Sequence, residues 1–388
     1  MNAVSRARAC LILLFLSFMT PFILPGCDMS APSPDNGELG ELLGGEIEPG
    51  FARAITPRTF HFPEDHGAHP DFRNEWWYFT GNLEDTDSRR FGYQLVIFRT
   101  ALTPEALPRR SAWATNQIYM AHFAISDLEA GHFRYFERFA RGALGLAGAT
   151  TDPLRVWLED WQIQGTEDGG WHLRARADGH ALDLRLSPRK PVVLQGAAGL
   201  SRKSERPGHA SYYYSQTRLA TRGTLTLPSG AFTVAGLSWL DREWSSSALA
   251  PDQAGWDWFA LQLDDGYDLM FYRLRRKDGS MDPASSGTLV DPAGRARHLR
   301  QEEVRLEALG HWRSPRGGRY PLRWRIAVPS HDLALEITPL LEAQELDVAV
   351  RYWEGAIAVQ GRHAGRPVSG RGYMELTGYG RPPRPGGR

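Results

Sequence analysis

Alternation of apolar and polar residues recurs along most of the chain and predicts β-strands. Clear examples are residues 182–186, 322–328 and 333–337, where Leu, Ile, Val or Trp alternate with charged or small residues. Turn signals such as Asp178-Gly179 and Asp265-Gly266 separate these runs. No long amphipathic helical pattern interrupts them. We therefore expect an all-β chain of many short strands, arranged as antiparallel sandwiches or barrels from about residue 58 to residue 380.

Two hairpin-like segments of the chain resemble each other. Residues 77–83 and 92–99 form the first copy, and residues 257–263 and 266–273 form the second. Each copy reads as an aromatic strand, a turn and an apolar strand that ends in Arg. Such a distant repeat predicts two related β domains, and chance similarity of two aromatic hairpins is the alternative. The stretch 196–208 is rich in Gly, Ser and Arg, so we place an N-terminal domain at residues 58–205 and a C-terminal domain at residues 206–380.

The first 27 residues read as an export signal. Two arginines precede an apolar stretch at residues 11–24, which is too short to span a bilayer. The segment ends in Leu-Pro-Gly-Cys and resembles a bacterial lipoprotein signal, in which Cys27 carries the lipid anchor. An ordinary secretory signal is the alternative. Asp28 resembles an inner-membrane retention signal, which implies a lipoprotein of the bacterial cell envelope at the periplasmic face of the inner membrane.

Composition narrows the choice of partners and chemistry. Residues 28–57 and 381–388 are rich in Pro and Gly and read as a flexible tether and a flexible tail. The 45 basic and 45 acidic residues balance, so we expect no nucleic-acid partner. Two cysteines cannot form a disulfide scaffold or a cysteine-rich zinc site. His66 and His69 have the spacing of a metal loop, but such loops are more often only polar, and we expect no metal and no cofactor.

Recognisable motifs for several enzyme classes are absent from the sequence. It contains no phosphate-binding loop, dinucleotide glycine pattern, zinc-protease motif or serine nucleophile elbow. The strongest candidate for chemistry is Asp241-Arg242-Glu243-Trp244. On a strand, Asp241 and Glu243 point to the same face. A carboxyl group buried among aromatic rings has a raised pKa and can donate a proton. The alternative is an ion-pair cluster that locks a domain interface.

Six segments of the chain resemble the AttH / carotenoid 1,2-hydratase-like family, often described as predicted secreted hydrolases. They are NEWWYFTGNL (74–83), QIYMAHF (117–123), YYYS (212–215), WLDREW (239–244), GWDW (255–258) and GYMELTGY (372–379). The resemblance implies two tandem lipocalin-like antiparallel β-barrel domains. In the family, the motif at 241–244 commonly has His where Arg242 stands. The resemblance to the carotenoid hydratases implies a reaction in which a His and an acid protonate and hydrate an isoprenoid double bond. Arg cannot exchange protons near neutral pH.

These considerations give two sets of candidate site residues. Catalytic candidates are Asp241, Glu243 and Arg242. Ligand-contacting candidates are aromatic or polar residues within the same motifs and repeats: Glu75, Trp77, Tyr78, His122, Tyr213, Trp239, Trp244, Trp258 and Tyr272. The alternative is that these side chains only pack or form hydrogen bonds in a core.

We therefore expect an exported lipocalin-like protein that holds a hydrophobic small molecule, such as an isoprenoid or a lipid, in aromatic-lined barrels. Its carboxylates would carry out hydrolase or hydratase chemistry. The alternative is a non-catalytic lipid-binding or chaperone-like lipoprotein that works with the permease of an ABC transporter. The resemblance implies this partner, because such transporters accompany some members of the family.

Overall fold

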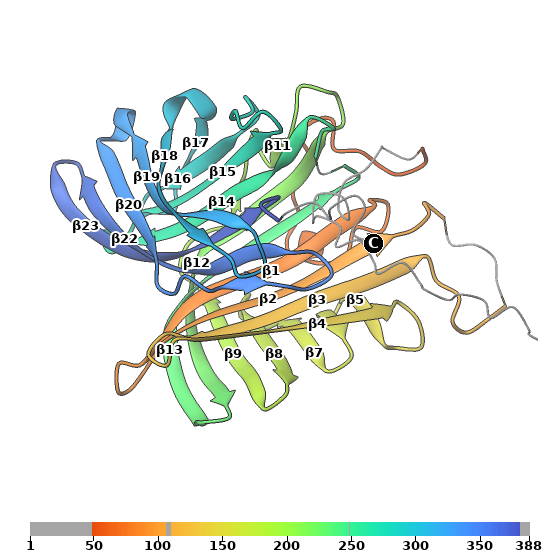
Figure 1. Cartoon of the computed structure of the whole chain (residues 1–388). Coiled ribbons are helices and arrows are strands. Elements are labelled where there is room, and N and C mark those ends of the chain that lie inside the picture. Colours follow the sequence, from red (N-terminus) through yellow and green to blue (C-terminus); the bar gives the residue numbers. More distant parts are fainter. Residues whose placement is uncertain (1–48, 106–109, 248, 381–388) are drawn as a thin grey trace, which may run out of the picture. The chain divides into compact units, whose positions relative to one another are not determined.

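The computed structural model describes residues 49–105, 110–247 and 249–380, and this part of the chain is all-β (Figure 1). Its helical content is three single 3-10 turns, Glu64–His66, Gln301–Glu303 and Pro329–His331. Within these residues, no helix is long and apolar enough to cross a membrane. The predicted signal peptide with Cys27, most of the predicted tether and the predicted tail lie outside the described residues.

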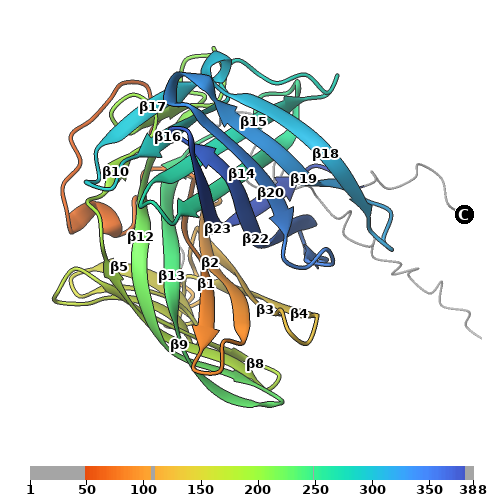
Figure 2. The ribbon, with the colours of Figure 1, turned by 90° about the vertical axis from the view of Figure 1, so that its left-hand side faces the viewer.

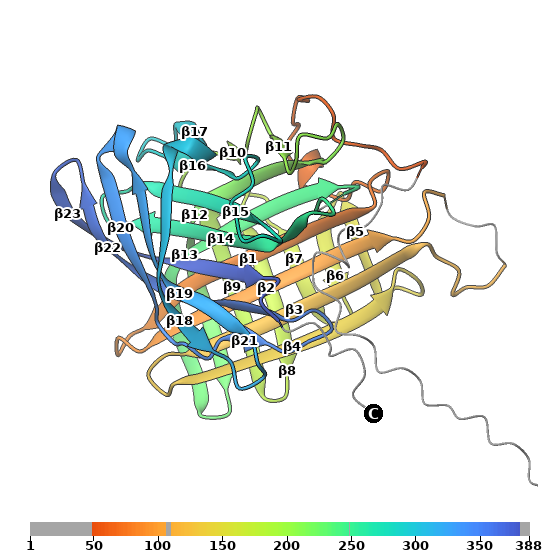
Figure 3. The same cartoon turned by 45° about the horizontal axis from the view of Figure 1, so that its top comes forward.

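The first sheet contains thirteen antiparallel strands in the order β4-β3-β2-β1-β13-β12-β9-β8-β7-β6-β5, with β10 and β11 paired to β12. Figure 3 shows the four strands β1 to β4 side by side. The strands are β1 (Asn74–Asp85), β2 (Arg90–Ala101), β3 (Gln117–Asp127), β4 (His132–Arg141), β5 (Ala147–Thr151), β6 (Leu154–Leu158), β7 (Trp161–Gly165), β8 (Trp171–Ala177), β9 (His180–Pro188), β10 (Val193–Leu194), β11 (Leu200–Arg202), β12 (Ala210–Leu227) and β13 (Gly230–Ser245).

The second sheet contains ten antiparallel strands in the order β17-β16-β15-β14-β23-β22-β20-β19-β18, with β21 paired to β22. They are β14 (Gln253–Leu263), β15 (Asp268–Arg276), β16 (Ser286–Val290), β17 (Ala296–Arg300), β18 (Arg305–Arg313), β19 (Arg319–Val328), β20 (Leu333–Pro339), β21 (Glu345–Leu346), β22 (Tyr352–His363) and β23 (Arg366–Thr377). The first sheet forms a nearly closed barrel and the second a half-barrel, so the predicted tandem lipocalin-like fold is confirmed.

Large apolar side chains fill the concave side of each sheet. Trp161 and Trp171 are fully buried in the core of the first sheet, and Trp324 and Trp353 in the core of the second. Trp244, which we expected to contact a ligand, is also fully buried. We expected a ligand cavity inside the barrels, but the pocket described below lies between the two sheets.

The repeated hairpins occupy equivalent central places in the two sheets. β1 pairs with β2, and β14 pairs with β15. In the first hairpin Glu75 lies directly opposite Arg99, and in the second Asp257 lies directly opposite Arg273. Both pairs are ion pairs with a fully buried carboxylate. Each sheet thus has the same hairpin at its centre, with a charged pair turned towards its own barrel.

The boundary between the sheets differs from the expected one at residues 205/206. Strands β12 and β13, residues 210–245, pair with β9 and β1 and so belong to the first sheet (Figure 2). The chain passes to the second sheet between Ser245 and Gln253. The stretch at 196–208 looked like a linker, but it contains strand β11, which is paired with β12 of the first sheet.

The predicted tether also ends earlier than expected. Phe51 and Ala54 are buried, and the hydroxyl of Tyr212 donates a hydrogen bond of 2.9 Å to the carbonyl of Thr56. Apolar side chains in this stretch therefore pack on the first sheet, so residues 51–56 belong to the folded protein.

The central strands of the two sheets pack against each other through a third apolar cluster. It contains side chains of β1, β2, β12 and β13 from the first sheet and of β14, β15, β22 and β23 from the second. Because side chains alternate along a strand, each of these strands has one face towards its own barrel and one towards the other sheet. On β13, for example, Leu240 packs into the first barrel while Trp239 packs between the sheets.

Candidate functional site

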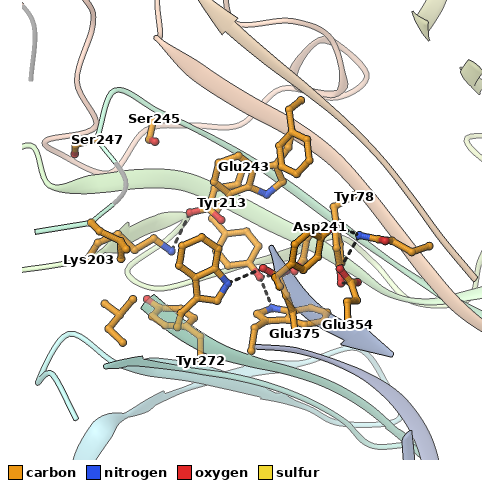
Figure 4. Close-up of a pocket in the computed structure, with 18 residues that line it drawn as sticks. Tyr78, Lys203, Tyr213, Asp241, Glu243, Ser245, Ser247, Tyr272, Glu354 and Glu375 are labelled. Atoms are coloured by element: carbon orange, nitrogen blue, oxygen red, sulfur yellow. Dashed lines mark hydrogen bonds and ion pairs between the residues drawn. The ribbon is translucent and has the colours of Figure 1, made fainter. Parts of the chain in front are cut away.

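A pocket lies between the two sheets, where the apolar cluster opens (Figure 4). Its side chains come from eight central strands and two loops: Trp76, Tyr78, Gln94, Phe98, Lys203, Tyr213, Asp241, Glu243, Ser245, Ser247, Leu249, Trp256, Trp258, Tyr272, Leu274, Tyr352, Glu354 and Glu375. Trp76, Leu249 and Trp256 are only half-buried. The enclosed volume is about 80 Å³, which is room for several water molecules. An organic ligand would therefore displace lining side chains or extend to solvent.

Asp241 lies at the centre of the pocket on β13. Its Oδ2 accepts a hydrogen bond of 2.5 Å from the Tyr213 hydroxyl, and its Oδ1 accepts one of 2.7 Å from the indole nitrogen of Trp239. Burial raises the pKa of Asp241 to about 7, although these hydrogen bonds favour the ionised form. This carboxyl group can therefore both hold and release a proton near neutral pH.

Glu354 on β22 and Glu375 on β23 face each other directly across the two strands. Both side chains line the pocket, from the sheet opposite Asp241 (Figure 4). Burial, reinforced by the charge of Glu375, raises the pKa of Glu354 well above its ordinary value. Burial also raises the pKa of Glu375, to about 8. Two buried carboxylates this close cannot both ionise at neutral pH, so the pair keeps at least one proton.

Polar partners hold the Glu354–Glu375 pair in place. The Tyr78 hydroxyl donates to Oε1 of Glu354, and Nε2 of Gln94 donates to its Oε2 over 2.6 Å. The indole nitrogen of Trp256 donates to Glu375 over 3.0 Å. These contacts orient both carboxyl groups into an aromatic surrounding.

Lys203 and Glu243 form a charged pair near the mouth of the pocket. Nζ of Lys203 lies 2.9 Å from Oε1 of Glu243, which also accepts from Ser211. The Lys203 ammonium group lies 4.4 Å from the ring centre of Tyr272. Burial opposes its charge, but Glu243 together with Tyr272 and Asp241 outweighs this effect, and the pKa of Lys203 is raised. The pocket thus has an ionic end at Lys203 and an end of proton-bearing carboxyl groups at Glu354.

The raised pKa of Glu375 predicts a pH dependence of stability. Above the ordinary pKa of about 4.5, the unfolded chain releases the Glu375 proton, whereas the folded protein keeps it. The contribution of this proton to the unfolding free energy is therefore complete below pH 4.5 and is lost as the pH rises through about 8. The loss is up to about 1.4 kcal/mol per pH unit. The Glu375→Gln variant should show a flatter dependence between pH 5 and 8 in urea unfolding. The control Glu167→Gln makes the same change at an exposed position and should follow the wild type. Equal slopes in wild type and Glu375→Gln would contradict the raised pKa.

The structure brings six of the residues expected from the sequence into this pocket. They are Tyr78, Tyr213, Asp241, Glu243, Trp258 and Tyr272. Trp239 lies directly behind the pocket, where it binds Asp241 and packs edge-on against Trp258. Strand alternation accounts for the shared face of Asp241 and Glu243.

Four other expected residues lie on the opposite face of the same strands, away from the pocket. They are Glu75, Trp77, Arg242 and Trp244, all fully buried. Arg242 forms an ion pair with Glu75, and its guanidinium carbon lies 3.9 Å from the ring centre of Trp77. Since Arg242 immediately follows Asp241 on an extended strand, its side chain points away from the pocket.

Glu75 is the centre of this internal charge cluster. Arg242 and Arg99 both contact its carboxylate, and the backbone N–H of His69 donates to it over 3.0 Å. Burial raises the pKa of Glu75, but the two guanidinium groups outweigh it, and the net pKa lies well below its ordinary value. Glu75 is thus a charged structural group, unlike Asp241, Glu354 and Glu375 of the pocket, whose pKa values are raised. Within the described residues, no three His, Cys, Asp or Glu side chains are placed to hold a metal ion.

His122, also expected at the site, lies behind the pocket wall. It is fully buried on β3, and its Nδ1 lies 2.8 Å from the hydroxyl of Tyr352, which does line the pocket. Glu354, Glu375, Lys203 and Tyr352 were not foreseen as site residues. The Tyr-Trp-Glu and Tyr-Met-Glu runs at 352–354 and 373–375 carried a signal, because in each run the acid alternates with an apolar core position.

Two mutually packed β-barrel sheets with an aromatic and acidic pocket between them define a tandem lipocalin-like protein. The chain belongs to the AttH-like family, whose model matches residues 53–379. The resemblance inferred from the sequence motifs is therefore confirmed. No curated protein matches the chain in sequence.

Solved structures show the same fold. A candidate AttH from Nitrosomonas europaea has 38% sequence identity and a TM-score of 0.76, with 85% of this chain and 100% of that chain covered. Kievitone hydratase from Nectria haematococca has 16% identity and a TM-score of 0.62, with coverages of 84% and 96%. CghA, solved with Sch210972, has 14% identity and a TM-score of 0.52, with coverages of 86% and 97%. At these lower identities the last two show similarity of fold alone.

Proposed function

We propose that this protein binds an apolar ligand with a carbon–carbon double bond in the pocket between its sheets and adds water across that bond, or removes water from the corresponding alcohol. One observation carries the proposal. Asp241, Glu354 and Glu375 converge on a single aromatic pocket from two sheets, and burial raises the pKa of all three. Such groups keep a proton at neutral pH and can act as general acids.

The chemistry requires a proton donor, a water molecule and a surrounding that tolerates positive charge. A neutral carboxyl group donates its proton to one alkene carbon, which leaves the other carbon electron-deficient. Water bonds to that carbon and releases a proton to a carboxylate, so the number of protons is conserved. The faces of Trp76, Trp256 and Trp258 are negative in electrostatic potential and stabilise a developing cation. Asp241, whose pKa lies near 7, is suited to both transfers.

The similarity of fold to kievitone hydratase supports this choice of reaction class. The pocket in this chain gives independent support, because Asp241, Glu354 and Glu375 have raised pKa values, whereas Glu243 is ion-paired with Lys203. The binding alternative uses the same pocket without chemistry. The charged pair of Lys203 and Glu243 would then hold a polar group of the ligand at the pocket mouth.

Heavy-oxygen water separates the two alternatives. Compounds that co-purify with the full chain would be extracted, identified by mass spectrometry and returned to the protein in heavy-oxygen water. We expect a product that is heavier by one labelled water, or an alcohol ligand that exchanges its oxygen with the label. Release of every extracted compound unchanged and unlabelled would favour binding without catalysis.

A further inference from the structure

A carboxylate, an imidazole and a phenol form a hydrogen-bonded line behind the pocket wall. Nε2 of His122 lies 3.1 Å from Oε1 of Glu137, and its Nδ1 lies 2.8 Å from the Tyr352 hydroxyl. The backbone N–H of Ala349 donates to the same Glu137 oxygen over 3.0 Å. Both nitrogens of the buried ring therefore have a partner that can exchange a proton.

The two ends of this line lie in different surroundings. The side chain of Glu137 on β4 is 21% exposed, whereas His122 is fully buried and Tyr352 lines the pocket. At the inner end, Nε2 of Gln94 donates to both the Tyr352 hydroxyl and Oε2 of Glu354. The phenol and the carboxyl group are thus held around one nitrogen. The hydrogen-bonded line therefore runs from the partly exposed Glu137 to Tyr352, whose hydroxyl shares the donor Gln94 with Glu354.

We propose that Glu137, His122 and Tyr352 form a proton relay that exchanges protons between solvent and Glu354. This inference rests on the proposed function, since it supplies the acid used there. A proton taken up at Nε2 of His122 from Glu137 allows Nδ1 to release another to the Tyr352 oxygen. Tyr352 passes its own hydroxyl proton on to Glu354, through a water in the pocket that both residues line. The reverse sequence removes a proton, and no charge accumulates.

The need for such a route follows from the burial of Glu354. Its side chain has almost no contact with solvent, and its neighbours Tyr78 and Gln94 are buried as well. If Glu354 donates a proton to the ligand and another carboxylate takes one from water, Glu354 must be reprotonated before the next turnover. His122 and Glu137 do not line the pocket, so in this proposal they act as positioning and relay residues.

The relay can be tested without a known substrate, by infrared spectroscopy of the full-length protein. The carbonyl stretch of a protonated Glu354 would be assigned by its loss in Glu354→Gln, and its shift after transfer to heavy water would report proton exchange. We expect exchange at least about tenfold slower in Tyr352→Phe and in Glu137→Gln. The control Tyr93→Phe removes a phenol that is equally buried but bonded to Ser238 in the first barrel, and should exchange at the wild-type rate.

Each outcome decides a different claim. Wild-type exchange rates in both relay variants would overturn the relay and leave the proposed acid intact. Equal slowing in the Tyr93→Phe control would also overturn it, because the effect would then be a general result of losing a buried hydroxyl. Absence of a protonated Glu354 band in the wild type would overturn the acid assignment, and the relay with it.

Discussion

The Glu75→Gln variant should lose about 3–5 kcal/mol of unfolding free energy, the range for breaking a buried ion pair. The substitution leaves the guanidinium groups of Arg242 and Arg99, both fully buried, without their shared carboxylate. Arg242→Met should cost less, because Glu75 keeps Arg99 as a partner. Urea unfolding at pH 7 measures both effects.

The same strand offers a matched control for this prediction. Glu84 on β1 forms an ion pair with Arg371, and both side chains are more than a third exposed. Exposed pairs contribute about 0–1 kcal/mol, so Glu84→Gln should change stability little. The double variant Glu75→Gln/Arg242→Met should lose less than the two single losses added together. A loss in Glu75→Gln as small as in Glu84→Gln would contradict the structural role and return Glu75 to the list of candidate site residues.

The Asp241→Asn variant should lose turnover of the co-purified compound by about 10²–10⁴-fold, the range for removal of a general acid or base. Asparagine keeps the shape and can still accept from Tyr213, but it cannot release a proton at this pH. Ligand retention, measured by mass spectrometry of the extracted variant, should therefore stay near that of the wild type. Loss of turnover with retained ligand assigns Asp241 to chemistry.

Two comparisons keep this result interpretable. Asp183→Asn makes the same chemical change at an exposed position on β9 and should leave turnover unchanged. Glu354→Gln removes the opposite acid and should also lower turnover, since the proposed reaction uses carboxyl groups on both sheets. If Asp241→Asn retains full turnover, Asp241 is not the acid, and Glu354 and Glu375 remain as the candidate donors.

Local patterns in the sequence predicted much of this architecture. Alternation identified the strands, and the repeated aromatic hairpins indicated two related domains. The placement of Asp241 and Glu243 on one face follows from strand geometry alone. The pairing of β12 and β13 with the first sheet did not follow, because the stretch at 196–208, which contains β11, has the composition of a linker.

Contacts between distant segments were beyond the reach of these patterns. Glu354 and Glu375 reach the pocket only because the last strands of the second sheet pack on β1 and β2, far away in the sequence. The sequence also could not distinguish Glu75 from Asp241. Both are acids among aromatic residues, yet one is neutralised by two arginines inside a barrel and the other stands between the sheets without a cation at hydrogen-bond distance.

The central claim is that the pocket carboxyl groups keep their protons near neutral pH. A pH titration of isotope-labelled Asp and Glu side chains by NMR tests it directly, with assignments from Asp241→Asn and Glu375→Gln. We predict midpoints of about 7 for Asp241 and about 8 for Glu375, with each signal absent from the matching variant. Titration of both residues below about pH 5, as in exposed carboxyl groups, would contradict the account.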